Sequence, residues 1–120
     1  MRKNIVLGIS LAPLASGLVQ GVLAGHWAAS VVALAFAYPF AVIVGLPVFF
    51  LLENNNKTSL PHLLAAGFVS GTLIGVFFTS SGSSLAMISI TFGIFAAHGT
   101  AVAFVFWFIA LRGKCIEKTA

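Results

Sequence analysis

The sequence contains no aspartate and only two acidic residues, Glu53 and Glu117, among its 120 residues. Neither glutamate lies within a long apolar run. Paired carboxylates, a Ser-His-Asp triad and an acidic metal cage all need acidic side chains in one site, so none of them can be assembled. A glycine-rich phosphate loop ending in Lys-Ser or Lys-Thr is also missing. The sequence therefore predicts a protein that is not an enzyme and holds neither a metal nor another cofactor.

Charge of either sign is scarce. Charged residues make up 7% of the chain and hydrophobic residues 60%, whereas soluble domains carry about 25% charged residues. With a mean hydropathy of +1.12, this composition excludes a soluble domain. Cysteine is equally scarce, because Cys115 stands alone and an internal disulfide is impossible. We interpret Cys115 as a free thiol, with lipidation as the alternative.

The charged residues form three clusters that leave two long uncharged stretches between them. The clusters are 2–3, 53–57 and 112–118, and the stretches run over 4–52 and 58–111. A helix needs about 20 apolar residues to cross a bilayer, so each stretch can cross twice. The prediction is an all-α integral membrane four-helix bundle of two helical hairpins, forming a single transmembrane domain over 1–120. Its helices are expected at about 5–25, 29–52, 60–79 and 85–111.

Basic residues predict the orientation of these helices. All six lysines and arginines lie in the three clusters, which four crossings place on one side of the membrane. The positive-inside rule then predicts a multi-pass protein of the bacterial inner membrane with both termini cytoplasmic. The basic start also fits a signal peptide, but the apolar run that follows is longer than a signal core. Nucleic acid is excluded as a partner, since no basic face with interleaved aromatics exists, and the lipid bilayer is the expected environment.

Glycines recur at every fourth position in the first and third expected helices. These two glycine ridges are Gly17, Gly21 and Gly25, and Gly67, Gly71 and Gly75. Such ridges let helix backbones approach closely within a bilayer. Because the two helices run in the same direction, we expect the ridges to face each other at the centre of the bundle. The alternative is that one ridge recruits a protein partner or a second copy of the chain.

A few polar residues interrupt the apolar spans. His98 lies near the middle of the last helix, where an ionisable group is a candidate functional residue. Ser84, Thr91 and His98 are seven residues apart and should share one helical face. We read His98 either as a hydrogen-bonded structural residue or as a group that contacts a ligand or responds to protons. Gln20 in the first helix is interpreted as a hydrogen-bonding residue that joins helices.

The second expected helix carries two prolines, Pro39 and Pro47. Proline lacks a backbone donor and its ring clashes with the preceding turn, so this helix is predicted to be kinked.

Length and span number resemble the small multidrug resistance transporters, which act as dimers. That family depends on a glutamate in its first helix, where this chain has Gln20. The segments Tyr38-Pro39-Phe40 and Gly45-Leu46-Pro47, with Phe106-Trp107 near the end, are similar to a group of small, uncharacterised four-helix bacterial inner-membrane proteins. This resemblance implies an architecture and no activity.

Two functions follow from the sequence as hypotheses. Abundant packing motifs with few chemical groups favour a non-enzymatic inner-membrane protein that acts through helix contacts with a partner, of the assembly, regulatory or toxin-immunity type. The alternative is a small oligomeric transporter or channel, suggested by the kinked second helix and the Ser84–Thr91–His98 face. A cofactor or quinone site is a third and weaker hypothesis.

Overall fold

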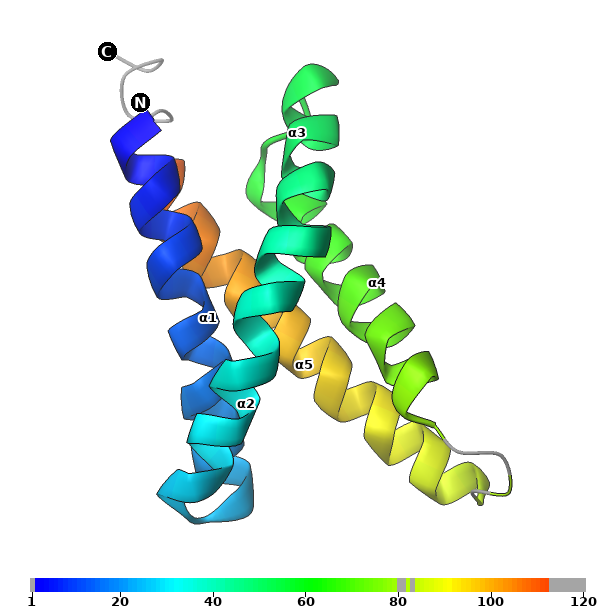
Figure 1. The fold of residues 1–120 in the computed structure, drawn as a ribbon. Coiled ribbons are helices and arrows are strands. Elements are labelled where there is room, and N and C mark those ends of the chain that lie inside the picture. Colours follow the sequence, from blue (N-terminus) through cyan, green and yellow to red (C-terminus); the bar gives the residue numbers. More distant parts are fainter. Residues whose placement is uncertain (1, 80–81, 83, 113–120) are drawn as a thin grey trace.

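The computed structural model describes residues 2–79, 82 and 84–112, and within them every regular element is a helix. This helical content confirms the predicted all-α class. Four continuous helical stretches in the described residues are long and apolar enough to cross a membrane, namely Lys3–Ala24, Trp27–Asn54, Leu60–Phe78 and Leu85–Ala110. The elements are α1 (Arg2–Ala24), α2 (Trp27–Phe40), η1 (Ala41–Gly45), α3 (Leu46–Asn54), α4 (Leu60–Phe78) and α5 (Leu85–Ala110). Figure 1 shows α2, η1 and α3 following one another along one side of the molecule.

The turn between α1 and α2 is shorter than the sequence suggested, because Trp27 is already helical. His26 caps α2, and its Nδ1 accepts a hydrogen bond from the Ala29 N–H at 3.3 Å. Before it, Gly25 has φ +69°, a left-handed conformation that glycine adopts without strain at a helix end. Gly25 was expected to be the third member of the first ridge. It instead ends the helix, and a Cβ there would meet nothing within 4 Å.

The two prolines of the second span flank a change of helix type. Between Pro39 and Pro47 lies the π-helical segment η1, in which the Leu46 N–H bonds to the Ala41 carbonyl five residues earlier. A π segment of this kind accommodates the loss of ordinary donors at proline while the helix continues. The predicted irregularity is therefore located between the prolines, and the helix runs on as α3 to Asn54.

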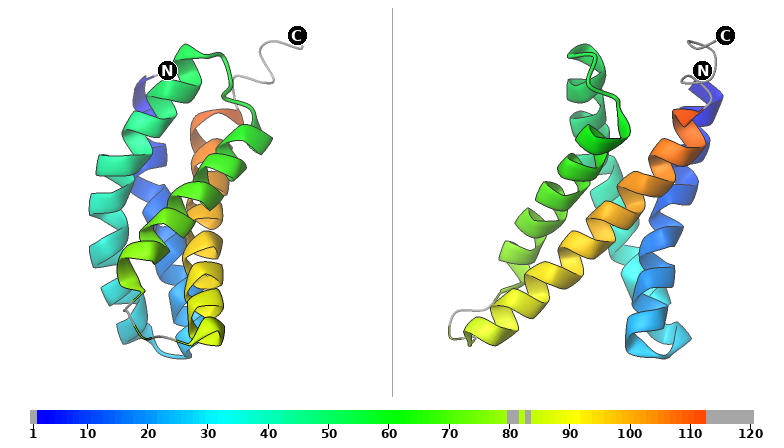
Figure 2. Two further views of the ribbon diagram at one scale, coloured as in Figure 1. Left: turned by 90° about the vertical axis from the view of Figure 1, so that its right-hand side faces the viewer. Right: turned by 180° about the vertical axis from the view of Figure 1, so that it is seen from behind.

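Helix α5 joins the parts of the bundle. It packs along both α1 and α4, whereas α2 packs on α1 and α3 makes a smaller contact with α4. Figure 2 shows α5 crossing the molecule between its neighbours. The start of α1, the end of α3, the start of α4 and the end of α5 lie at one end of the molecule (Figure 1). The packed core lies towards that end, where Phe49, Leu63 and Phe106 are buried.

The glycine ridges do not face each other, so this expectation is wrong. A Cβ on Gly17 would lie 2.8 Å from Leu34, and one on Gly21 would meet the Ser30 hydroxyl, both on α2. On α4, the ridge of Gly67, Gly71 and Gly75 packs against α5. Each ridge thus contacts the helix that follows it in the chain. The spacing identified the close-packed face of each helix, but a repeat within one helix carries no information about which neighbour it meets.

Candidate binding cavity

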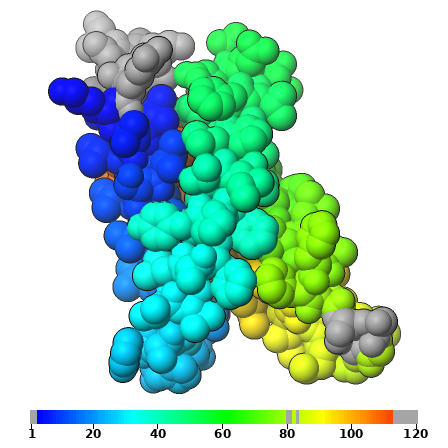
Figure 3. Space-filling model, viewed as in Figure 1, coloured from blue at the N-terminus to red at the C-terminus, as the bar shows by residue number. Residues whose placement is uncertain are grey.

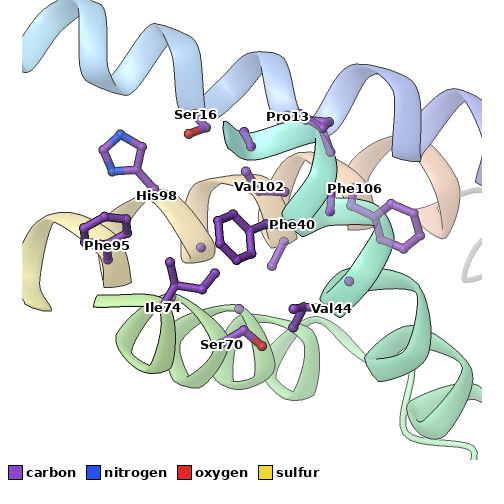
Figure 4. Close-up of a pocket in the computed structure, with 18 of the residues that line it drawn as sticks. Pro13, Ser16, Phe40, Val44, Ser70, Ile74, Phe95, His98, Val102 and Phe106 are labelled. Atoms are coloured by element: carbon purple, nitrogen blue, oxygen red, sulfur yellow. The ribbon is translucent and has the colours of Figure 1, made fainter. Parts of the chain in front are cut away.

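A half-open cavity of about 440 Å³ lies between the helices, and every helical element contributes to its wall. Small side chains create much of this space, among them Ala33 and Ala37 on α2, Ala66 on α4 and Ala103 on α5. The volume falls in the range of about 300–1,000 Å³ that is usual for small-molecule sites. Figure 4 shows side chains from α1, α2, α4 and α5 converging on it. The cavity is therefore formed by tertiary packing and belongs to no single helix.

Phenylalanine dominates the apolar wall. Six rings line the cavity, those of Phe36, Phe40, Phe49, Phe78, Phe95 and Phe106. Towards the end of the molecule that holds the first residues of α1, Phe49 and Phe106 meet edge to face at 5.1 Å. Such aromatic contacts are worth about 0.5–1.5 kcal/mol beyond their buried area. This contact joins α3 to α5 and closes the cavity on that side.

A second aromatic contact lies on the side where α2 and α4 diverge. The Phe36 ring of α2 meets Phe78 of α4 edge to face at 6.0 Å. Phe78 also stacks on Phe95 of α5, with centroids 5.1 Å apart. Figure 3 shows a hollow in the surface between the lower part of α2 and the end of α4. Both Phe36 and Phe78 remain about half exposed, so these two rings form a thin wall between the cavity and the surroundings.

His98 is the ionisable residue of the cavity wall. Its Nδ1 lies 2.6 Å from the Ile94 carbonyl oxygen, one turn earlier on α5. A carbonyl oxygen can only accept, so Nδ1 must carry the proton of this bond. In the neutral imidazole, Nε2 then keeps its lone pair. His98 therefore presents a hydrogen-bond acceptor to the cavity.

Two classes of hydroxyl group can be compared in the bundle. One class bonds to its own helix, with the hydroxyl donating to the carbonyl four residues earlier at 2.8–2.9 Å, and comprises Thr72, Thr79, Ser89, Thr91 and Thr100. The other class is Ser16 and Ser70, which line the cavity. Within the described part of the chain neither side chain has a hydrogen-bond partner, although Ser16 is only 5% exposed. A hydroxyl that borders an apolar wall without a hydrogen-bond partner is unfavourable, so Ser16 and the partly buried Ser70 are candidates for contact with a guest.

Gln20 joins this polar group, since it lines the cavity one turn beyond Ser16 on α1. Its amide has no hydrogen-bond partner among residues 2–79, 82 and 84–112. Figure 4 shows Ser16 and His98 on the same side of the cavity, with Ser70 across from them on α4. The cavity thus holds four polar side chains in a wall that is otherwise apolar.

Only one residue of the predicted Ser84–Thr91–His98 face reaches the cavity. Ser84 precedes α5 and caps it, accepting a hydrogen bond from the Met87 N–H at 3.3 Å. Thr91 donates to the Met87 carbonyl instead of facing the cavity. His98 alone of the three lines the cavity wall. Seven-residue spacing aligned these positions correctly, but it could not show that backbone groups use the first two side chains.

The other histidines lie away from the cavity. His26 caps α2, and the His62 imidazole bonds to the Ser59 hydroxyl at 2.6 Å. No group of three potential metal ligands among His, Cys, Asp and Glu occurs in the described residues.

Comparison with known proteins adds no relative. No protein-family model, curated protein or solved structure matches the chain.

Proposed function

We propose that this chain is a non-enzymatic protein of the bacterial inner membrane that binds a small lipophilic molecule inside its helix bundle. The observation that carries the proposal is the cavity with four polar side chains, of which Ser16, Gln20 and Ser70 lack partners in the described chain. Packed membrane helices normally leave neither so large a space nor such polar groups unpaired.

Membrane insertion is supported by the four long apolar helices and by the distribution of charge. The start of α1, the loop between α3 and α4 and the end of α5 lie at the same end of the bundle (Figure 1), and these segments carry Lys3, Lys57 and Arg112. At that end Arg112 also lies over the Phe108 ring, 4.5 Å from its centroid. Under the positive-inside rule this end faces the cytoplasm. The cavity then lies within the depth of the bilayer, where lipophilic molecules concentrate.

Water alone does not suit this cavity. A buried water needs about two to four polar partners, and the wall offers four polar side chains in all. Most of the volume would remain next to phenylalanine and aliphatic side chains. A mainly apolar guest with one polar group matches the wall better.

Recruitment of a protein partner through the glycine ridges is less well supported by this geometry. Gly17 and Gly21 are covered by α2, and Gly67 and Gly71 by α5, so a partner would have to displace a helix of the same chain. Binding of a partner protein or of a second copy of the chain remains a prediction, and it would have to use other faces of the molecule.

The proposal is tested by photolabelling in lipid nanodiscs with an alkyl-diazirine probe, followed by mass spectrometry of the labelled peptides. Saturable labelling of cavity residues such as Phe40 and Ile74 is expected, with unlabelled probe as the competitor. Filling the cavity with Ser70→Phe should remove the saturable part of the labelling. The matched control is Val69→Phe, because Val69 is 55% exposed and is not among the residues that line the cavity.

Ala37→Leu provides a milder filling variant if Ser70→Phe does not fold, as judged by circular dichroism and gel filtration. Labelling of cavity residues that rises in proportion to probe concentration and is unaffected by either filling variant would contradict the proposed function.

A further inference from the structure

The chemistry of the polar wall restricts which guest fits, and this inference rests on the proposed binding function. We infer that the cavity selects a neutral lipophilic phenol, whose hydroxyl donates to His98 Nε2 and accepts from the Ser16 hydroxyl. The two side chains lie on the same side of the cavity in Figure 4, on α5 and α1.

A donor on the guest is required by the hydrogen bond that His98 already makes. Because Nδ1 donates to the Ile94 carbonyl, neutral His98 offers only an acceptor to the cavity. An ether or ketone guest has no hydrogen to donate and would leave Nε2 unpaired. A hydroxyl satisfies Nε2 and still has lone pairs for the proton of Ser16.

A charged guest is disfavoured because none of the described residues that line the wall is Asp, Glu, Lys or Arg, and neutral His98 carries no charge. An organic cation or a carboxylate would lose its hydration and find no opposite charge in the cavity, which is strongly unfavourable. The guest should therefore be neutral.

The aromatic wall favours a ring over an aliphatic chain next to the hydroxyl. Phe40 and Phe95 lie near the polar groups in Figure 4. Offset-stacked or edge-to-face contacts with these rings stabilise a bound aromatic ring beyond the burial of its apolar surface. A phenol combines such a ring with the required donor.

Hydrogen bonds must decide which guest binds most strongly, because a guest enters the cavity from lipid and not from water. Acyl chains are as apolar as the cavity wall, so moving an alkyl group from lipid into the cavity gains little. A phenol hydroxyl inside the hydrocarbon core lacks the partners that His98 and Ser16 provide.

The test compares 4-octylphenol with 4-octylanisole, in which a methyl group replaces the hydroxyl hydrogen. Binding of tritiated 4-octylphenol to protein in nanodiscs is measured against empty nanodiscs, with both competitors expressed as mole fraction in lipid. We expect saturable binding, with the phenol about tenfold stronger than the anisole, as for the loss of one hydrogen bond to a partner left unpaired. 4-Octylbenzoic acid should compete less well than the phenol.

Substitutions at His98 and Ser16 test whether these two side chains make the hydrogen bonds to the phenol. His98→Phe should reduce the phenol-to-anisole ratio to about one, whereas His98→Gln, which keeps an acceptor, should retain part of it. Ser16→Ala should lower the ratio by several fold. Thr91→Val is the matched control on α5, since its hydroxyl bonds to Met87 and does not line the cavity, and it should bind as the unmodified protein does.

The outcomes separate this inference from the proposed function. Equal affinity for phenol and anisole, with saturable binding of both, would overturn the phenol inference while supporting an apolar guest. Stronger binding of the benzoic acid would overturn the requirement for neutrality. If the photolabelling probe also shows no saturable site, both proposals fail.

Discussion

Gly67 and Gly99 meet backbone against backbone where α4 crosses α5, since neither residue has a side chain to hold the helices apart. A Cβ on Gly67 would run into the Gly99 carbonyl oxygen, and a Cβ on Gly99 into the Gly67 carbonyl oxygen. Backbone atoms cannot move aside as the end of a side chain can. This crossing fixes the distance between α4 and α5, and with it the position of His98, the neighbour of Gly99, in the cavity wall.

Gly67→Ala is therefore expected to destabilise the protein by about 1–3 kcal/mol, the usual cost of overpacking. The control is Gly93→Ala on α5, because a Cβ at Gly93 meets nothing within 4 Å and alanine is the better helix former by about 1 kcal/mol. Unfolding in mixed detergent, followed by circular dichroism, measures both variants. A Gly67→Ala protein as stable as the Gly93→Ala protein would show that α4 and α5 are not packed at this crossing.

Phe78→Ala is predicted to open the thin wall between α2 and α4. The substitution removes the contacts of Phe78 with Phe36 and with Phe95, so a guest should exchange with the bilayer faster. Dissociation of tritiated 4-octylphenol is expected to accelerate about tenfold, if the two ring contacts together contribute about 1.4 kcal/mol to the barrier. Phe77→Ala is the matched control, since Phe77 is 88% exposed. Identical exchange rates in the two variants would place the entry elsewhere.

Ser16→Ala should stabilise the empty protein even though it weakens binding. In the absence of a guest, Ser16 is 5% exposed and its hydroxyl has no hydrogen-bond partner in the described chain, so its removal from the apolar wall should stabilise the protein by about 1 kcal/mol. Thr91→Val provides the comparison, because it removes a hydroxyl that is hydrogen-bonded. Thermal unfolding without and with 4-octylphenol measures both effects. A loss of stability in empty Ser16→Ala would indicate that the serine has a structural partner.

The orientation of the chain is tested with reporter insertions. Green fluorescent protein inserted after Asn55, in the loop between α3 and α4, should fluoresce, because that loop is predicted to face the cytoplasm. Alkaline phosphatase inserted after Gly82, between α4 and α5, should be active, because it is predicted to reach the periplasm. The opposite pair of results would reverse the topology and place the basic clusters outside.

The sequence predicted the elements of this fold far better than their contacts. Long runs without charge predicted four apolar helices, since backbone polar groups in such runs must be satisfied within a helix. Which helices pack together could not be predicted in this way. Gly17 and Gly67 have the same spacing pattern, but they meet Leu34 and Gly99, on different helices. That choice depends on the whole arrangement in space.

The cavity illustrates the same limit. Gln20 and His98 stood out in the sequence as polar residues within apolar runs, and both line the cavity. Ser70 did not stand out, because a serine in such a helix usually bonds to its own backbone, as Ser89 does. Only the packing of five other elements around α4 shows that Ser70 borders an open space.

The central place of α5 has a consequence for biogenesis. Helix α5 packs along both α1 and α4, but it is synthesised after both of them. While the ribosome is still translating α5, α1 and α4 lack the surface on which each of them mainly packs, and the cavity lacks one of its walls. The bundle should therefore consolidate late, after the last span has entered the membrane. A quality-control protease that surveys the bilayer would encounter α4 without its main packing partner, beside a hairpin of α1 and α2 that is already packed.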